Sequence, residues 1–287
     1  MRMSPLFNWD KGRATALFDS VIKGSPSVLE YDFALYPIAN IMRLCEPKAT
    51  AQGWMNMLKS RQSDFSQQAY GEFLFLYHCR YHDSWSRNKL TTLLRTMKSR
   101  RILLGLAHGA SHLWKHARCR VYAAKVIEGL ASSKDPLIVH AVTNLFRLTR
   151  DELELSPHVR RIILRITQNR RAILESAEDV LELLSPLAGV EPKLVLRVCN
   201  ALLGVGRDEI RRHGWSSVPE SLTNIALTLH RQRKFRAAGL KLFESLLELN
   251  VGEAKAALDV LDRNPVIKVA PYRPRQSRRR RGTVQKD

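Results

Sequence analysis

Apolar residues recur at helical spacing along almost the whole chain. Four sets occupy positions i, i+3, i+4 and i+7, which is the pattern of one face of an α-helix. The sets are Val159, Ile162, Ile163 and Ile166; Val195, Val198, Cys199 and Leu202; Leu222, Ile225, Ala226 and Leu229; and Ala254, Ala257, Leu258 and Leu261. No run alternates apolar and polar residues, and no Asn-Gly or Asp-Gly pair marks a hairpin. The pattern predicts an all-α protein.

Prolines mark several helix starts. Asp135-Pro136 and Ser156-Pro157 each place an N-cap side chain before a proline at the first helical position, where its missing N–H group is not needed. With the apolar spacing, these signals predict helices over 10–22, 27–44, 47–59, 64–82, 86–114, 117–131, 136–149, 157–169, 174–186, 192–205, 219–232, 235–249 and 252–263.

The predicted segment 86–114 is long for one helix and contains Gly105 and Gly109. A division into two helices is therefore open, and with it a sub-boundary of the domain near 84–116. The helical domain is expected to span residues 1–265.

About thirteen helices joined by short connections indicate stacked antiparallel pairs. A new pair begins roughly every 35–40 residues, the range of HEAT-type and tetratricopeptide (TPR) arrays. The clearest unit is ALTLHRQRKFRAAGLKLFESLLELN (226–250), where small Ala237, Ala238 and Gly239 near the start of the second helix allow close helix approach. We predict a HEAT/TPR-like α-solenoid. A globular helical bundle is the alternative.

The net charge of the chain says more about its partners than its overall composition does. The chain of 287 residues is 45% apolar and 26% charged, as in ordinary globular proteins of one or two domains. Its net charge is +20, from 47 basic and 27 acidic residues, and only seven of the basic residues lie in the last seventeen. The excess therefore belongs to the body as well as to the tail, and it favours polyanionic partners: nucleic acid, acidic protein surfaces or anionic lipid.

Residues 84–127 contain no Asp or Glu. Their basic residues are Arg87, Lys89, Arg95, Lys98, Arg100, Arg101, Lys115, Arg118, Arg120 and Lys125. Since a solvated surface normally mixes both signs, one interpretation is a groove that contacts phosphates, with Trp85, Trp114 or Tyr122 stacking on bases. The other is that these charges meet acids elsewhere in the fold, such as Glu175, Glu178, Asp179 and Glu182.

The end of the chain, PYRPRQSRRRRGTVQKD, has too few apolar residues to form a core. We expect residues 266–287 to be a disordered Arg-rich tail. Such arms bind nucleic acid non-specifically or serve only as solubilising ends. On the first interpretation its consecutive arginines complete the polyanion site: Arg278, Arg279, Arg280 and Arg281.

LAHGASHLWKH (106–116) places His108, His112 and His116 four residues apart. In one straight helix the first and last would lie about 12 Å apart along the axis, too far for one zinc ion. A pair would need a third ligand. The candidates are Cys119, His78 and His82. We interpret the histidines as a half-buried stripe with Trp114, and we expect no metal ion and no cofactor.

The four cysteines, Cys45, Cys79, Cys119 and Cys199, are scattered and contain no CxxC pair. Their spacing argues against a disulfide framework and a thiolate zinc site, and it fits a reducing cytoplasm. The N-terminus has no apolar signal-peptide core, and no stretch approaches roughly eighteen uncharged apolar residues. We therefore expect a cytoplasmic protein without a membrane span.

The sequence contains no P-loop, GxGxxG, GxSxG, HExxH or EF-hand motif, so we predict that the chain is not an enzyme.

Three segments together resemble the C-terminal helical region of large bacterial STAND/NACHT-like NTPases of antiviral defence. They are GEFLFLYHCRYHDSW (71–85), ILLGLAHGASHLWKHARCRVYAAKVIEGL (102–130) and PESLTNIALTLHRQRKFRAAGLKLFESLLELNVGEAKAALDVLDRNP (219–265). In those proteins a helical array follows an effector and a P-loop module and acts as a sensor or scaffold. The resemblance implies a detached C-terminal part that cannot itself hydrolyse nucleotide.

Two functions follow as expectations. The first is a non-catalytic helical scaffold or sensor that binds a macromolecule, with protein as the expected partner. The alternative is a nucleic-acid-binding protein that uses the 84–127 basic region and the tail.

Overall fold

The computed structural model describes residues 10–31, 48–148, 155–206, 217–249 and 251–263. These residues form fourteen α-helices and two short 3₁₀ helices, without a β-strand, which confirms the all-α prediction. The α-helices are α2 (Lys11–Gly24), α4 (Lys48–Ser60), α5 (Asp64–Tyr81), α6 (Ser84–Thr96), α7 (Arg100–Leu113), α8 (Ala117–Leu130), α9 (Pro136–Leu148), α10 (Pro157–Ile166), α11 (Arg170–Glu175), α12 (Ala177–Leu184), α13 (Pro192–Leu203), α15 (Val218–Arg231), α16 (Arg236–Glu248) and α17 (Gly252–Arg263). The 3₁₀ helices are η1 (Pro26–Glu30) and η3 (Ser185–Leu187).

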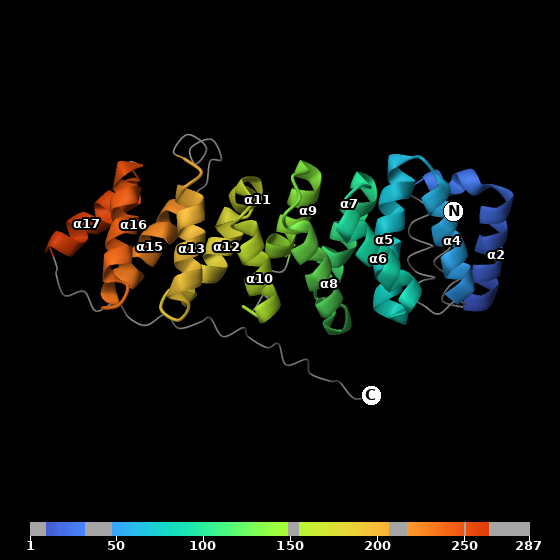
Figure 1. The fold of residues 1–287 in the computed structure, drawn as a ribbon, viewed down its shortest axis with the longest axis horizontal. Helices are drawn as coiled ribbons and strands as arrows, with labels where there is room; N and C mark the ends of the chain where they lie inside the picture. The colour runs from blue at the N-terminus through green and yellow to red at the C-terminus, as the bar shows by residue number, and fades with distance from the viewer. Residues whose placement is uncertain (1–9, 32–47, 149–154, 207–216, 250, 264–287) are drawn as a thin grey trace, which may run out of the picture.

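The helices follow one another in chain order along the long axis of the molecule, with α2 and α4 at one end and α16 and α17 at the other (Figure 1). Most helices contact the helix two places further along the chain. One row consists of α5, α7, α9, the α11–α12 pair, α15 and α17, and a second row consists of α6, α8, α10, α13 and α16. One continuous cluster of buried apolar side chains holds the rows together.

Three of the four predicted apolar faces are buried in full. Val159, Ile163 and Ile166 on α10 are each at most 1% exposed, and the sets on α13 and α15 are equally covered. The predicted caps are also present, since the Ser156 hydroxyl accepts a hydrogen bond from the Val159 N–H (3.3 Å) and an Asp135 oxygen accepts one from Leu137 (2.9 Å). The positions of these helices and the faces that they bury were therefore predictable from the apolar spacing and the capping residues.

Polar contacts join successive helix pairs at a recurring distance in the sequence. The Asn169 amide donates to the Ser133 carbonyl (2.7 Å), the Arg170 guanidinium donates to the Val205 carbonyl (3.0 Å), and the Gln232 amide donates to Gly189. These contacts, with the Ser111 hydroxyl on the Ala141 carbonyl, join residues 30 to 43 positions apart. Each of these contacts connects elements that are not consecutive along the chain.

The long segment 86–114 is divided, but not at its glycines. Helix α6 ends at Thr96, where Met97 adopts a left-handed conformation (φ 50°) and its N–H bonds to the Leu93 carbonyl. Gly105 lies inside α7 instead. The sequence did not reveal the break because left-handed helix ends usually carry glycine or asparagine.

Glycines bring α5 and α7 into backbone contact. A Cβ atom added at Gly71 would overlap the Ile102 carbonyl, and one added at Gly105 would overlap the Gln68 carbonyl. Gly109 lies one turn further along the same contact, beside Glu72. The α15–α16 pair has the close approach that its small residues predicted, since a Cβ at Gly239 would overlap the backbone nitrogen of His230.

Two other predicted helices differ from the structure. In place of a helix over 27–44, the described part contains η1, which ends at Tyr31 in extended backbone (φ −109°, ψ 141°), and residues 32–44 lie outside the described ranges. The predicted helix 174–186 is interrupted at Ser176, whose hydroxyl bonds to the Ala172 carbonyl (2.7 Å) and ends α11. Within the described ranges, no helix is long and apolar enough to cross a membrane.

We expect Gly105→Ala to lower the free energy of unfolding by about 3 kcal/mol, because α5 and α7 would have to move apart. The control is Gly53→Ala, inside α4, where an added Cβ has nothing within 4 Å. That variant should gain roughly 0.5–1 kcal/mol from helix propensity. Urea unfolding followed by circular dichroism measures both, and equal effects of the two substitutions would contradict the close helix contact.

Candidate functional site

The basic residues of 84–127 lie on one contiguous part of the array. They come from α6, α7 and α8 and from the short segments that join these helices. Lys89 and Arg101 are half-buried, and the remaining eight are exposed. We refer to these ten residues as the basic surface.

Two members of the basic surface are neutralised by acids from other helices. Arg100 pairs with Asp135 before α9, and Arg101 pairs with Asp64 at the start of α5. Two of the acids suggested by the sequence have other contacts: Glu175 pairs with Arg171 (2.8 Å), and Glu178 accepts a hydrogen bond from Ser217. The Arg120 guanidinium donates to the Trp114 carbonyl (3.3 Å). Within the described part of the chain, Arg87, Arg95, Lys98 and Arg118 have no acidic partner, so the surface keeps most of its positive charge.

The start of the basic surface is held by Asp83, the N-cap of α6. One carboxylate oxygen accepts from the Ser86 N–H (2.9 Å) and hydroxyl (2.6 Å), and the other accepts from Tyr77 (2.9 Å) and pairs with Lys48 (2.8 Å). Burial alone would raise the pKa of Asp83, but the hydrogen bonds from Lys48, Ser86 and Tyr77 outweigh it and hold this pKa well below its usual range. Asp83 therefore ties α4, α5 and α6 together as a carboxylate.

His78 continues this network toward α8. Its Nδ1 lies 2.9 Å from the Ser86 hydroxyl oxygen. Because the Ser86 proton goes to Asp83, we assign Nδ1 of His78 as the donor, which leaves Nε2 as an acceptor. Burial lowers the pKa of His78, and nearby His82 and Arg87 lower it further, so the ring is neutral at pH 7.

A cavity of about 230 Å³ lies between α5, α6 and α8, beside His78. Its polar lining is supplied by His78, Arg87, Thr91, Tyr122 and Lys125. Two cations and two hydroxyl groups in a cavity of this size are suited to one phosphate group. The basic surface thus combines exposed charge with a recess for an anion.

The aromatic residues considered for base stacking are less available than the sequence suggested. Trp114 is only 3% exposed, so it belongs to the core and cannot stack on a ligand. Half-buried Trp85 packs against Tyr77 with ring centroids 5.4 Å apart. Tyr122 lines the cavity, and its ring stacks on that of His82 (4.8 Å). Only Tyr122 combines an aromatic ring with a position at the recess.

The three histidines of 106–116 do not share one helix. His108 is half-buried and His112 exposed on α7, with ring centroids 6.4 Å apart, whereas α7 ends before Trp114 and His116 is the N-cap of α8. The single stripe expected from the sequence is therefore wrong for His116. Among the described residues, no three His, Cys, Asp or Glu side chains converge to hold a metal ion. The tail arginines 278–281 lie outside the described residues.

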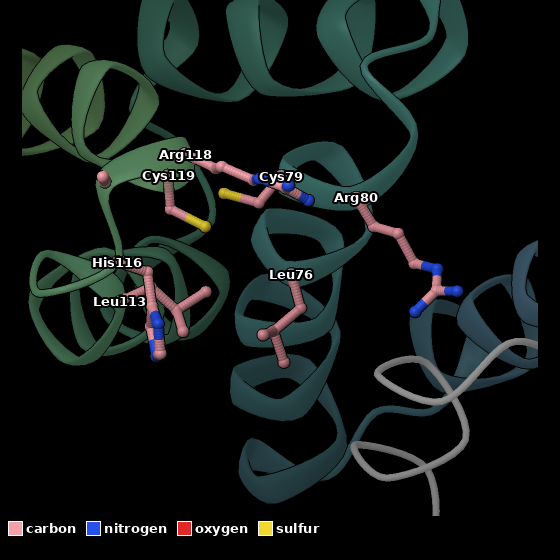
Figure 2. A pocket seen from close by; sticks show the side chains of 8 residues that line it. Leu76, Cys79, Arg80, Leu113, His116, Arg118 and Cys119 are labelled. Carbon is pink, nitrogen blue, oxygen red and sulfur yellow. The ribbon is translucent and has the colours of Figure 1, made fainter.

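A second cavity, of about 330 Å³, lies between α5, the end of α7 and the start of α8 (Figure 2). Cys79 from α5 and Cys119 from α8 line it, and their sulfur atoms point toward each other. The sequence did not reveal this pair because only closely spaced cysteines form a recognisable motif. The two cysteines are 40 residues apart, which is one interval of the predicted repeat. That spacing could have suggested that they lie at equivalent places on neighbouring helix pairs.

We expect Asp83→Asn to lower the free energy of unfolding at pH 7 by about 2 kcal/mol, because it removes a charge-assisted network. Since the pKa of Asp83 is lower in the folded state, its contribution is present above the unfolded-state pKa of about 4 and is lost as the pH falls through the folded-state pKa. The difference between the wild type and the variant should therefore shrink below about pH 4 in chemical unfolding.

Asp64→Asn is the matched control, because the Asp64 side chain is 69% exposed and, among the described residues, its acidic group pairs with Arg101 at the surface. It should change stability by less than about 0.5 kcal/mol. Equal losses in both variants at pH 7 would contradict the central role of Asp83.

Comparison of the chain with protein-family models, curated proteins and solved structures finds no match. The functional inference consequently depends on the residues and contacts described above.

Proposed function

We propose that this chain is a non-enzymatic helical-repeat scaffold, a HEAT/TPR-like α-solenoid over residues 1–265, that binds a nucleic acid through its basic surface. The observation that carries the proposal is that most of the cations on α6, α7 and α8 are exposed and that, within the described residues, Arg87, Arg95, Lys98 and Arg118 have no acidic partner. A broad surface of unneutralised arginine and lysine binds the phosphate backbone with release of counterions.

The assignment to a solenoid is supported by the two rows of helices and by the regular interval of the contacts between helix pairs. When each unit bonds mainly to the next, an array of helix pairs lengthens without closing around one core. The elongated course of the helices in Figure 1 agrees with this architecture.

The cavity beside His78 supports nucleic acid as the partner. Arg87 and Lys125 approach it from α6 and α8, two helices of the second row, so a phosphate bound there would bridge these helices beside His78 of α5. The neighbouring exposed cations would then follow the backbone on either side. The Arg-rich tail, residues 266–287, would add non-specific affinity in the same proposal.

A protein partner is the second candidate, and one observation favours it. Leu17 and Val21 lie one turn apart on α2, at one end of the array, and are 41% and 40% exposed. An apolar pair at the end of a helical array is a surface that a further protein element could cover. In the specific form implied by the sequence resemblance, this scaffold or sensor would serve a cytoplasmic bacterial defence system.

The solenoid proposal predicts local rather than global unfolding. Gly239→Val should separate α15 from α16, because even a Cβ at this position overlaps the backbone of His230. Hydrogen exchange measured by mass spectrometry should show loss of protection over residues 218–248 and retained protection over 64–130. Uniform loss along the chain would instead indicate one cooperative globular bundle.

Nucleic-acid binding predicts a specific dependence on salt. Replacing Arg87, Arg95 and Arg118 by Gln should weaken binding of a fluorescein-labelled RNA or DNA oligonucleotide. The slope of log K against log salt should become shallower by about two, because up to three phosphate contacts are lost. Fluorescence anisotropy from low to physiological salt gives the slope.

The charge-matched control replaces exposed Lys193, Arg197 and Arg233 by Gln, on and beyond α13. This variant should keep nearly the wild-type slope. Equal effects of the two triple variants would show that net charge alone attracts the probe, and absence of binding at low salt would leave the protein partner as the better candidate.

A further inference from the structure

Cys79 and Cys119 form a thiol pair between two helices. Cys79 lies in the last turn of α5 and Cys119 in the first turn of α8, and these helices contact each other. The sulfur atoms of the two thiols point toward one another in Figure 2, and Cys119 lies close enough to raise the pKa of Cys79. Disulfide formation needs side chains that already face each other across a short gap, because two cysteines that point apart cannot be joined without backbone movement.

The thiol pair opens onto the cavity of about 330 Å³ described above. Leu76 and Leu113 supply its apolar wall, and His116 and Arg118 supply polar groups. Arg80 also borders it but lies against the Tyr81 ring, 5.4 Å from the ring centre. A small molecule can therefore reach the thiols past a positively charged rim.

The two thiols differ in burial. Cys79 is 8% exposed, whereas Cys119 is half-buried. Burial raises the pKa of Cys79, and the neighbouring Cys119 raises it further, so Cys79 remains protonated at pH 7. Since the thiolate is the nucleophile, the more accessible Cys119 is the thiol that reacts first. Cys199 offers a contrast within the same chain, because it is fully buried in α13.

We propose that Cys79 and Cys119 form an oxidisable dithiol site that reacts with a small disulfide carrying carboxylate groups, of the glutathione disulfide type. The carboxylates match Arg118 at the rim of the cavity, and the apolar wall accommodates the carbon chain. The product is a disulfide that joins α5 to α8 and thereby links the two rows of helices. The site shares Arg118 with the basic surface, but the reaction of the thiols does not require nucleic-acid binding.

The reaction is an exchange in two steps. The Cys119 thiolate attacks one sulfur of the small disulfide, the S–S bond of that molecule breaks, and one small thiolate leaves. Cys79 then gives its proton to a thiolate or to water and attacks the Cys119 sulfur, which releases the second small thiol. In total, the two protein thiols lose two electrons and two protons, and the small disulfide is reduced to two thiols.

The test is incubation of the purified full-length chain with glutathione disulfide, followed by alkylation and peptide mass spectrometry. The wild type should lose two alkylatable thiols, and its mass should fall by two hydrogen atoms, with a Cys79–Cys119 cross-linked peptide. Cys199 should remain alkylatable after unfolding. Cys79→Ser should stop at a glutathione adduct on Cys119, and Cys119→Ser should leave Cys79 unmodified.

The charged rim is tested with a second disulfide. Arg118→Gln should slow the reaction with glutathione disulfide by up to about fivefold and leave the reaction with neutral hydroxyethyl disulfide unchanged. Arg95→Gln, on α6, is the control and should change neither rate.

Three results would overturn the proposal, and the first two come from the wild type, so they do not depend on whether a variant folds. They are retention of both thiols at saturating oxidant, a stable glutathione adduct on Cys119 without the cross-link, and equal rates for Arg118→Gln and Arg95→Gln. Equal rates for these two variants would show that Arg118 gives the site no preference for disulfides that carry carboxylate groups.

Discussion

The backbone contact between α5 and α7 is the constraint on which the rest of this structure depends. Gly71 and Gly105 lie where any side chain would strike the carbonyl of the opposite helix, so the two helices meet without intervening side chains. This contact sets the place of α8, which packs on both helices. It therefore brings the end of α5, with His78 and Cys79, against residues that follow some 40 positions later.

The same geometry accounts for the distribution of charge. Arg100 and Arg101 lie at the start of α7, next to the helix ends that carry Asp135 and Asp64, and their charge is used to join neighbouring helix pairs. Arg87, Arg95 and Arg118 lie away from those junctions and remain exposed. The basic residues thus form two groups. One group pairs with acids at helix ends, and the other stays exposed on a surface that a polyanion can reach.

Asp83 and the thiol pair show two uses of the boundary between α5 and the second row of helices. Asp83 is a fixed carboxylate that holds α4, α5 and α6, and its hydrogen bond to Ser86 sets the orientation of His78. Cys79 and Cys119 lie on the other side of this boundary, next to a separate cavity. An anion recess and an oxidisable pair can therefore be close in the fold without sharing residues.

The sequence by itself determined the all-α class, the buried faces of α10, α13 and α15, and the caps at Ser156 and Asp135. These follow from periodicity and from local hydrogen bonds, which act within a few residues. Only the tertiary structure decided that α6 ends at Met97, that Trp114 is buried and that Cys79 faces Cys119. Each of these depends on how neighbouring helices pack, because a residue's surroundings come from side chains that are distant in the sequence.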